Sequence, residues 1–162
     1  MTKITHKNGK KSKIKQKIGW KEWVALPELN IREIKAKIDT GAATSALHAE
    51  ILSIIEYQGE QYIRFKVYHD QSDKIAPKIC KAKLVANRFV MSSSGHREKR
   101  YVIVTTVIVG KLSFITEITL TDRSPLRFRM LLGRLALRKH FIIDPAKTHL
   151  LGRPLYEHHG VI

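Results

Sequence analysis

The chain has 162 residues, of which 43% are hydrophobic and 27% are charged. This is the composition of one folded globular domain, and it excludes a largely disordered protein. The net charge of +16 is compatible with a cationic enzyme or with a protein that binds polyanions, and the single cysteine, Cys80, excludes an internal disulfide.

The first 18 residues are interpreted as a disordered basic leader. Residues 1–21 contain eight lysines and no acid, so this segment supplies +8, half of the net charge. It is either a solvated tail that aids solubility or an arm attracted without sequence specificity to RNA, DNA or the ribosome. It lacks the apolar core of a secretion signal, and no later run is long enough to cross a bilayer. Together with the lone cysteine, these features predict a cytoplasmic protein with no membrane partner.

Residues 19–155 are predicted to form the folded domain, and residues 156–162 a C-terminal tail. Alternating polar and apolar residues in WKEWVAL and REIKAKID predict a hairpin that leads to Asp39, and Gly59 marks the turn of a second hairpin. Further strands are predicted at 80–90, 101–110, 112–121, 128–133 and 141–144.

The remaining segments are assigned by composition. RLALRKH is built from good helix formers, whereas the polar segments 69–78 and 92–100 are predicted to be loops. Eight to ten short strands, one short helix and no internal repeat indicate an all-β domain, either a small closed barrel or a sandwich.

Asp39-Thr40-Gly41 follows directly on an alternating strand. This order puts a carboxylate at a tight turn, beside a hydroxyl that can tie the loop to a neighbour. Gly41 has no side chain, so a second backbone or a substrate can come close. Such a tripeptide alone is a common strand-end turn, but a second motif accompanies it. RMLLGRLAL, residues 129–137, places two leucines before Gly133 and then begins a helix.

Together, IDTGA near the beginning and LLGR near the end resemble the paired signatures of retropepsin-type aspartic proteases. The segments GWKEWVALPEL, KIDTGAATSALHA, SSSGHREKR and FRMLLGRLALRKHFIIDPAK are similar to a bacterial family of small retropepsin-like proteins, often labelled ATP-dependent zinc proteases. The resemblance covers residues 19–153. It implies an all-β, retropepsin-like acid-protease closed barrel with one short helix near the C-terminus. Some members of that family accompany a glutamate ligase that modifies a ribosomal protein.

The resemblance also implies roles for individual residues. Asp39 is half of an acid–base dyad, Thr40 braces the two loops of a dimer, and Gly41 lets the substrate backbone pass. The loop is supported by Ala42, Leu131, Leu132 and Gly133. Peptide hydrolysis of this type needs two carboxylates that share a proton, and no other aspartate begins an Asp-Thr-Gly or Asp-Ser-Gly turn. We therefore expect a homodimer that contributes Asp39 twice across a two-fold axis.

One position departs from the retroviral pattern. Retroviral enzymes usually carry an acid two places after the glycine, which pairs with the arginine of their Gly-Arg motif. Here Ala43 stands at that position, so Arg134 either has another partner or is available to a substrate carboxylate. Two segments, SSSGH and HDQSDKIAPK, are candidates for the flap that would cover the site, and the sequence does not decide between them.

No metal ion or other cofactor is expected. The chain has no H-E-x-x-H motif, no paired cysteines and no G-x-x-x-x-G-K-[ST] loop, so neither the zinc nor the ATP of the family label has support in the sequence. His48 follows the Asp39 loop closely, and it is interpreted as a core or surface histidine. His158 and His159 are interpreted as solvated tail residues.

A non-catalytic basic module that binds RNA, the ribosome or another polyanion is the alternative function. Basic residues gather in 123–140 and in SSSGHREKR, and on one surface they would attract a polyanion. Aromatic residues make up only 7% and are not interleaved with the basic positions, so no stacking platform is predicted.

The same basic residues suit acidic peptides such as glutamate-rich tails, and Arg97, Arg129 and Arg134 are the candidate substrate-binding residues. The sequence thus predicts an aspartic-type peptidase, or a peptidase-like regulator, that acts as a homodimer on an acidic peptide or protein.

Overall fold

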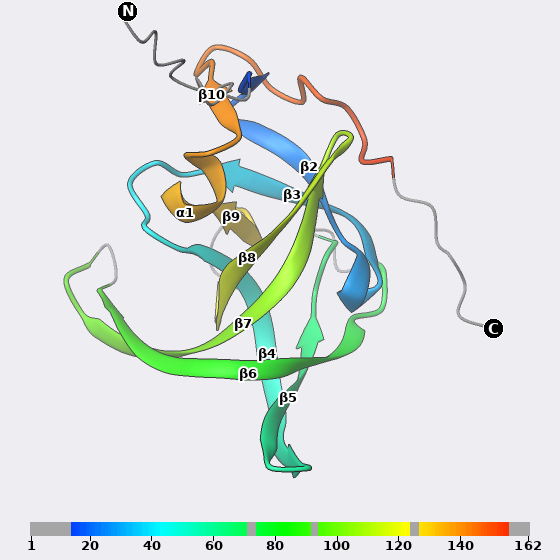
Figure 1. Cartoon of the computed structure of the whole chain (residues 1–162), viewed down its shortest axis with the longest axis vertical. Helices are drawn as coiled ribbons and strands as arrows, with labels where there is room; N and C mark the ends of the chain where they lie inside the picture. The colour runs from blue at the N-terminus through cyan, green and yellow to red at the C-terminus, as the bar shows by residue number, and fades with distance from the viewer. Residues whose placement is uncertain (1–13, 71–73, 92–93, 124–126, 156–162) are drawn as a thin grey trace, which may run out of the picture.

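The computed structural model describes residues 14–70, 74–91, 94–123 and 127–155, and they form an all-β domain (Figure 1). A 3-10 turn, η1 (Pro27–Leu29), and one short helix, α1 (Arg134–Leu137), accompany the strands. The strands are β1 (Gln16–Ile18), β2 (Lys21–Leu26), β3 (Ile31–Ile38), β4 (Ser45–Tyr57), β5 (Glu60–Val67), β6 (Lys78–Met91), β7 (Arg97–Val109), β8 (Leu112–Thr121), β9 (Met130–Leu132) and β10 (Phe141–Ile143).

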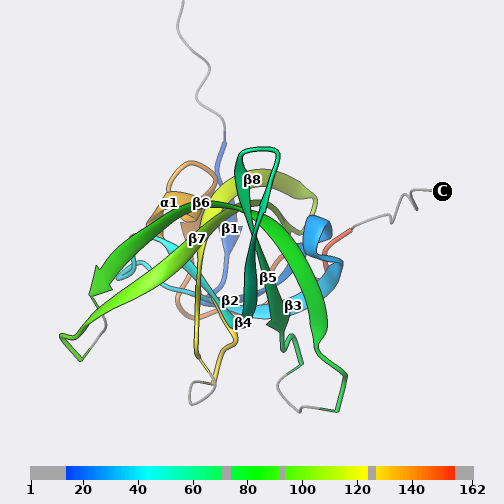
Figure 2. The ribbon, with the colours of Figure 1, turned by 90° about the horizontal axis from the view of Figure 1, so that it is seen from below.

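Eight of these strands form one sheet that closes on itself. The strand order is β2-β3-β9-β4-β5-β6-β7-β8, and additional pairings join β4 to β8 and β2 to β7. Figure 2 shows the strands wrapping around a common interior, with the β4–β5 and β6–β7 hairpins extending beyond it. The short β9 lies between β3 and β4, parallel to β3 and antiparallel to β4. This arrangement confirms the all-β, retropepsin-like fold with one short helix near the C-terminus.

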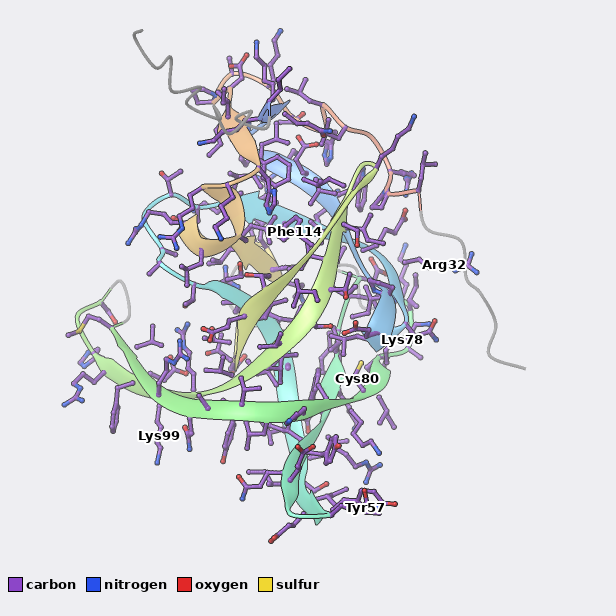
Figure 3. The ribbon with its side chains drawn as sticks, in the orientation of Figure 1. Arg32, Tyr57, Lys78, Cys80, Lys99 and Phe114 are labelled. Carbon is purple, nitrogen blue, oxygen red and sulfur yellow. The ribbon has the colours of Figure 1, made fainter. Side chains whose placement is uncertain are left out.

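Strict alternation along the strands fills the interior. In β5, Ile63, Phe65 and Val67 are fully buried, and the residues between them are polar and face outward. This is the period of two that a sheet with one wet face requires. Cys80 joins the core from β6, and burial raises the pKa of its thiol to about 11. Figure 3 shows its sulfur between β6 and η1.

Three strands are much longer than the short strands that the sequence predicted. β4 and β7 have 13 residues each and β6 has 14, and register shifts place one extra residue in β4 and one in β6. Such bulges let a long strand curve around a closed sheet. The β4–β5 hairpin turns at Gln58 and Gly59, both with positive φ, which suits the right-handed twist of the flanking strands.

The N-terminal boundary differs from the predicted one. Gln16–Ile18, which the sequence placed in the disordered leader, form β1 and pair in parallel with β10. Ile18 is fully buried, so this strand belongs to the folded domain. The rest of the leader, residues 1–13, and the C-terminal tail, 156–162, lie outside the described residues. In the described ranges no helix is long and apolar enough to span a membrane.

A buried carboxylate ties the C-terminal segment to this end of the domain. Glu22 on β2 is fully buried, and its carboxylate accepts hydrogen bonds from the backbone N–H groups of Gly19, Leu150 and Leu151 at 2.9–3.0 Å. Three donors satisfy a charge that would otherwise be costly to bury. Glu22 thereby holds two separate segments of backbone, at Gly19 and at Leu150–Leu151, around one side chain.

Replacing Glu22 with glutamine should destabilise the protein. The amide keeps one oxygen but turns an NH₂ group toward backbone donors, so at least one buried N–H loses its acceptor. We expect Glu22→Gln to lower the free energy of unfolding by about 3 kcal/mol in urea denaturation. Glu33→Gln is the matched control, because Glu33 pairs with Arg153 at the surface and its loss should leave the midpoint almost unchanged. Equal midpoints for the two variants would contradict this role of Glu22.

Candidate active site

Asp39 lies at the end of β3, in a loop that its own backbone and side chain organise. Its N–H donates to the Leu132 carbonyl at 2.9 Å, which extends the β3–β9 pairing by one residue. Its Oδ1 accepts the N–H of Gly41 at 3.0 Å, and its carbonyl accepts the N–H of Ala42 at 3.3 Å. The carboxylate is therefore held by a tight turn, while Thr40 and Gly41 remain exposed.

Gly133 brings the end of β9 against this loop. A Cβ atom at this position would lie 2.6 Å from the carbonyl carbon and oxygen of Thr44 and 2.9 Å from the Ala42 oxygen. No real side chain tolerates such distances to backbone atoms, so only glycine fits. The Gly133 N–H donates to the Ser45 hydroxyl at 3.1 Å, and the Arg134 N–H donates to the Ala42 carbonyl at 2.9 Å. The predicted support residues thus lie directly against the Asp39 loop.

Arg134 has a partner within the same loop. Its Nη1 donates to the Thr40 carbonyl at 2.9 Å. Ala43 leaves no carboxylate for this arginine, and the backbone oxygen of the Asp39 turn takes that place. Arg134 is still exposed and retains further N–H donors. Of the two roles that the sequence left open, the structure shows the one in which the guanidinium holds the loop.

One face of the β3–β9–β4 region carries the polar side chains. Met130 and Leu132 point into the core, so Arg129 and Leu131 point to the opposite face. Asp39 follows the core residue Ile38 and leaves the strand on that opposite face, as Leu131 does. The register places Met130, the residue after Arg129, beside Ala36, three residues before Asp39, which corresponds to about 10 Å along the strand. Asp39 and Arg129 therefore belong to one surface, at different points along it.

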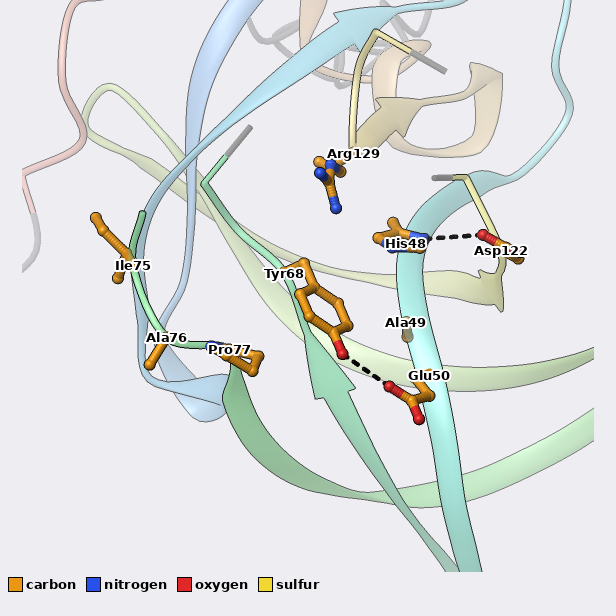
Figure 4. A pocket seen from close by; sticks show the side chains of 9 residues that line it. All are labelled: His48, Ala49, Glu50, Tyr68, Ile75, Ala76, Pro77, Asp122 and Arg129. Atoms are coloured by element: carbon orange, nitrogen blue, oxygen red, sulfur yellow. Dashed lines mark hydrogen bonds and ion pairs between the residues drawn. The ribbon is translucent and has the colours of Figure 1, made fainter. Parts of the chain in front are cut away.

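A cavity of about 590 Å³ opens at the Arg129 end of this face (Figure 4). Polar side chains from separate elements point into it: His48 and Glu50 from β4, Tyr68 after β5, and Arg129 before β9. The Tyr68 hydroxyl donates to Glu50 at 2.8 Å. Apolar walls come from Ala49, Ile75, Ala76 and Pro77. The cavity has the size and mixed lining of a site for a small ligand or a peptide side chain.

His48 is buried in this region and accepts a hydrogen bond from the backbone. Its Nδ1 accepts the backbone N–H of Arg123 at 2.8 Å, which places the proton of the neutral ring on Nε2. Burial lowers the pKa of His48, and the nearby charge of Arg129 lowers it further. The Asp122 carboxylate, 3.6 Å from Nδ1, acts in the opposite direction. The imidazole is therefore kept neutral at pH 7.

Arg123 is a site neighbour that sequence reasoning did not single out. It is 8% exposed, and its Nε donates to the Phe128 carbonyl at 3.1 Å. Burial lowers the pKa of its guanidinium, the charge of Arg100 adds to this, and the Asp39 carboxylate opposes it. Arg123 thus places a buried positive charge in the electrostatic field of Asp39. Its sequence context, TDRS, carried no signal for this, because its contacts with His48 and Phe128 arise only in the tertiary structure.

The basic residues that the sequence predicted to share one surface lie in different places in the structure, and some of them are buried. Arg123 and Arg129 are buried, so they do not belong to an exposed basic surface with the helix residues Arg134 and Arg138. Arg97 is exposed near the end of the β6–β7 hairpin, with its guanidinium 4.2 Å from the centroid of the Phe89 ring. Figures 1 and 2 both place that end of the hairpin on the same side of the molecule as the β3–β4 loop.

The two candidate flap segments occupy different places. SSSGH belongs to the β6–β7 connection, and residues 75–77 of HDQSDKIAPK line the cavity beside Tyr68. Positions 71–73 and 92–93 of these segments lie outside the described residues. Among the residues that are described, no three His, Cys, Asp or Glu side chains are grouped so that they could hold a metal ion.

Adding a methyl group at Gly133 should disrupt the loop under Asp39. The clash is with backbone atoms, which cannot rotate away, so Gly133→Ala should lower the free energy of unfolding by about 3 kcal/mol. Gly95→Ala is the control: φ is +83° there but nothing lies within 4 Å, so only a backbone penalty of about 1 kcal/mol is expected. Chemical denaturation measures both, and a Gly133→Ala protein as stable as wild type would contradict the close packing.

Protonation of His48 should destabilise the domain. Because the folded state lowers the pKa of this residue, the unfolded chain binds the proton more readily below pH 6.5, and stability falls as the pH drops from there. His48→Asn keeps an acceptor near the Nδ1 position and cannot titrate. Thermal melts at pH 7.5 and 5.0 should therefore show a smaller acid-induced loss in His48→Asn than in wild type. His149, whose pKa is also lowered by burial, accounts for part of the remaining loss. An unchanged pH dependence in His48→Asn would refute the assignment.

Known proteins are similar to this chain in sequence. Residues 17–154 match the family described as retropepsin-like aspartic endopeptidase RimB. A protein of Shewanella pealeana is 38% identical over 135 residues, and one of Desulfotalea psychrophila is 39% identical over 138 residues. Both carry the name "Probable alpha-L-glutamate ligase". The matches cover 83% and 85% of this chain but only 30% of each relative, so the chain spans less than a third of their length.

A solved structure has the same fold. The crystal structure of Lpg0085 from Legionella pneumophila, a protein described as of unknown function, superimposes with a TM-score of 0.71 at 28% sequence identity. The match covers 84% of this chain and 98% of that one. The family match extends over nearly all of the described domain and includes both the Asp39 loop and the Gly133 support. The chain therefore belongs to the RimB-like family of retropepsin-like aspartic endopeptidases.

Proposed function

We propose that the protein is an aspartic-type peptidase that acts as a homodimer, with one Asp39 carboxylate from each chain. The observation that carries the proposal is the Asp39-Thr40-Gly41 turn. It is fixed from below by Gly133 and from the side by Arg134, and Thr40 and Gly41 remain exposed. A turn that is rigid and yet open to a second molecule is what a shared dyad requires.

No second Asp-Thr-Gly or Asp-Ser-Gly turn occurs in the sequence to supply the other carboxylate. Asp144 accepts the N–H of the nearby Ala146, Asp122 lies beside His48, and Asp70 lines a small cavity with Trp23. A two-fold axis next to Thr40 and Gly41 would bring a second Asp39 to the first, because identical surfaces meet across such an axis.

In that dimer the two carboxylates would share one proton, since like charges a few ångströms apart cannot both ionise. The ionised group would take a proton from the attacking water, and the protonated group would donate to the oxygen of the scissile carbonyl. Thr40 would brace the paired loops, and Gly41 would leave room for the substrate backbone.

An acidic peptide is the proposed substrate. The cavity on the Asp39 face contains the Arg129 guanidinium, and Arg134 presents donors beside the turn. A carboxylate side chain would find charge-assisted hydrogen bonds at either place. The related proteins carry the name of a glutamate ligase, and a glutamate-rich chain is therefore the acidic substrate that we propose. The protein would then act as a cytoplasmic partner of such a ligase, as a peptidase or as a peptidase-like regulator.

Asp39→Asn should abolish hydrolysis. An amide can neither take the proton from water nor share one with a second carboxylate, so kcat on a glutamate-rich peptide should fall by about 10³-fold or more. The measurement is cleavage followed by mass spectrometry, with a glutamine-rich peptide of equal length as the substrate control. Asp144→Asn, which keeps an oxygen acceptor for its turn, should retain activity. An Asp39→Asn protein with full activity would refute the catalytic assignment.

Mixing the two proteins tests the dimer. If each site needs two Asp39 residues, an equal mixture of wild type and Asp39→Asn contains about one quarter wild-type homodimers after subunit exchange. Activity per total protein should then fall to about a quarter, and to about a half if each chain acts alone. Sedimentation velocity on the same samples establishes whether dimers are present.

A further inference from the structure

The sheet has a second buried strip on the side opposite to the central core. Leu131, Ala46, Thr119 and Val102 lie beside one another in the register, on β9, β4, β8 and β7. Each is at most 8% exposed, although the residues next to it along its strand, and not the residue itself, belong to the core cluster. Because side chains alternate along a strand, these four point to the face that Leu131 shares with Asp39.

Arg100 lies in the next row of this face, one step farther from the catalytic turn. It precedes Tyr101, which packs against the core, so the Arg100 side chain points away from the core. The register pairs Tyr101 with Leu120. Arg100 therefore lies near Thr121, the next residue of β8, and Thr121 is beside the cavity residue His48. The Arg100 side chain is only 15% exposed, so a largely covered guanidinium lies close to the cavity.

Arg97 and Arg100, both from the segment SSSGHREKR, point to opposite sides of the β6–β7 hairpin. They are three positions apart on one strand, so alternation separates them, and Arg97 lies over the Phe89 ring. The charge of Arg100 acts on the candidate site instead. Burial and then the charge of Arg100 lower the pKa of Arg123, and the Asp39 carboxylate raises it. Arg100 therefore belongs electrostatically to the region around Asp39.

Glu98 binds Arg100 through a single oxygen. Nε and Nη2 of Arg100 both donate to Oε2 of Glu98, at 3.2 and 3.1 Å, and the Thr121 hydroxyl donates to Oε1 at 2.9 Å. Because the carboxylate divides its oxygens between two partners, it does not form the parallel two-oxygen fork that is strongest for arginine. The Glu98 side chain is also 45% exposed, and ion pairs of this kind contribute little stability.

A neighbouring arginine–glutamate pair has the geometry that Arg100 lacks. Nη1 and Nη2 of Arg88 donate to different oxygens of Glu117, at 2.8 and 3.3 Å. Arg88 lies beside Arg100 in the register, so the two pairs can be compared on one hairpin. A further carboxylate would improve on the existing partner at Arg100, whereas at Arg88 it would only reproduce the existing geometry.

We propose that Arg100 is a specificity-determining residue of the peptidase site, and that Glu98 occupies its anion position until a carboxylate of an acidic substrate takes that place. The inference rests on the proposed acidic substrate. A substrate carboxylate can bring both oxygens to the guanidinium, while Glu98 turns to solvent. A neutral peptide supplies no replacement for Glu98, so it leaves the pair in place and is disfavoured at this part of the face.

Binding, measured separately from cleavage, tests the proposal. The probe is labelled octaglutamate, and its fluorescence anisotropy is followed with the full chain carrying Asp39→Asn in every sample. Adding Glu98→Gln keeps an acceptor for Thr121 and releases Arg100, so affinity should rise by about fivefold. Adding Arg100→Gln should lower affinity by about tenfold or more. The matched control is Glu60→Gln, which makes the same charge change at the Lys83 ion pair of β5 and β6 and should alter affinity by less than about twofold.

The combined variant Glu98→Gln/Arg100→Gln separates this pair from net charge, because it restores the charge of the starting protein. It should bind octaglutamate as weakly as Arg100→Gln does. Affinity equal to that of the starting protein would overturn the proposal, as would a Glu98→Gln protein that binds no more tightly than Glu60→Gln, or absence of octaglutamate binding. Thermal melts establish folding, and the Glu98→Gln comparison decides alone if Arg100→Gln does not fold. Hydrolysis that persists in Asp39→Asn would refute the catalytic role of Asp39 without changing these affinities.

Discussion

The contact of the Gly133 backbone with the loop after β3 is the constraint on which the candidate site depends. Asp39 lies at the end of a strand, where a loop would ordinarily have several conformations open to it. Here the missing side chain of Gly133 lets two backbone segments touch, with hydrogen bonds from Arg134 to Ala42 and from Asp39 to Leu132 on either side of the contact. The Asp39 turn thereby gains the rigidity of the sheet beneath it, and it stays open on its other side.

A buried polar layer extends this rigid region toward the cavity. Arg123, His48 and Arg129 are all at most 9% exposed, and backbone hydrogen bonds hold them near the start of β4 and the end of β8. Buried cations are costly unless their N–H groups are satisfied, and the Phe128 carbonyl accepts the Nε–H of Arg123. Arg123 interacts electrostatically with Asp39, and His48 and Arg129 line the cavity.

The long strands have a separate consequence. β4, β6 and β7 extend past the closed part of the sheet, and their outer surfaces have no layer packed on them (Figures 1 and 2). In this region polar and apolar residues alternate, as in any half-exposed strand, but the polar ones are mostly basic.

The sequence by itself determined the strands, the short helix and the pair of motifs around Asp39 and Gly133. These follow from local patterns: alternation with a period of two, glycine at a forced close approach, and helix-forming residues after it. It also indicated that Arg134 needs a new partner, since Ala43 cannot supply a carboxylate. Local patterns decide local structure, and here they were sufficient for the architecture.

Only the tertiary structure decided which polar groups are buried and what they contact. The burial of Glu22, Arg123 and Arg129, and the Thr40 carbonyl as the partner of Arg134, all depend on segments far apart in the chain. The same holds for β1, whose three residues read as part of a charged tail until they pair with β10. No local pattern in a single sequence predicts such contacts, because they form only when strands and loops that are far apart in the chain meet around one core.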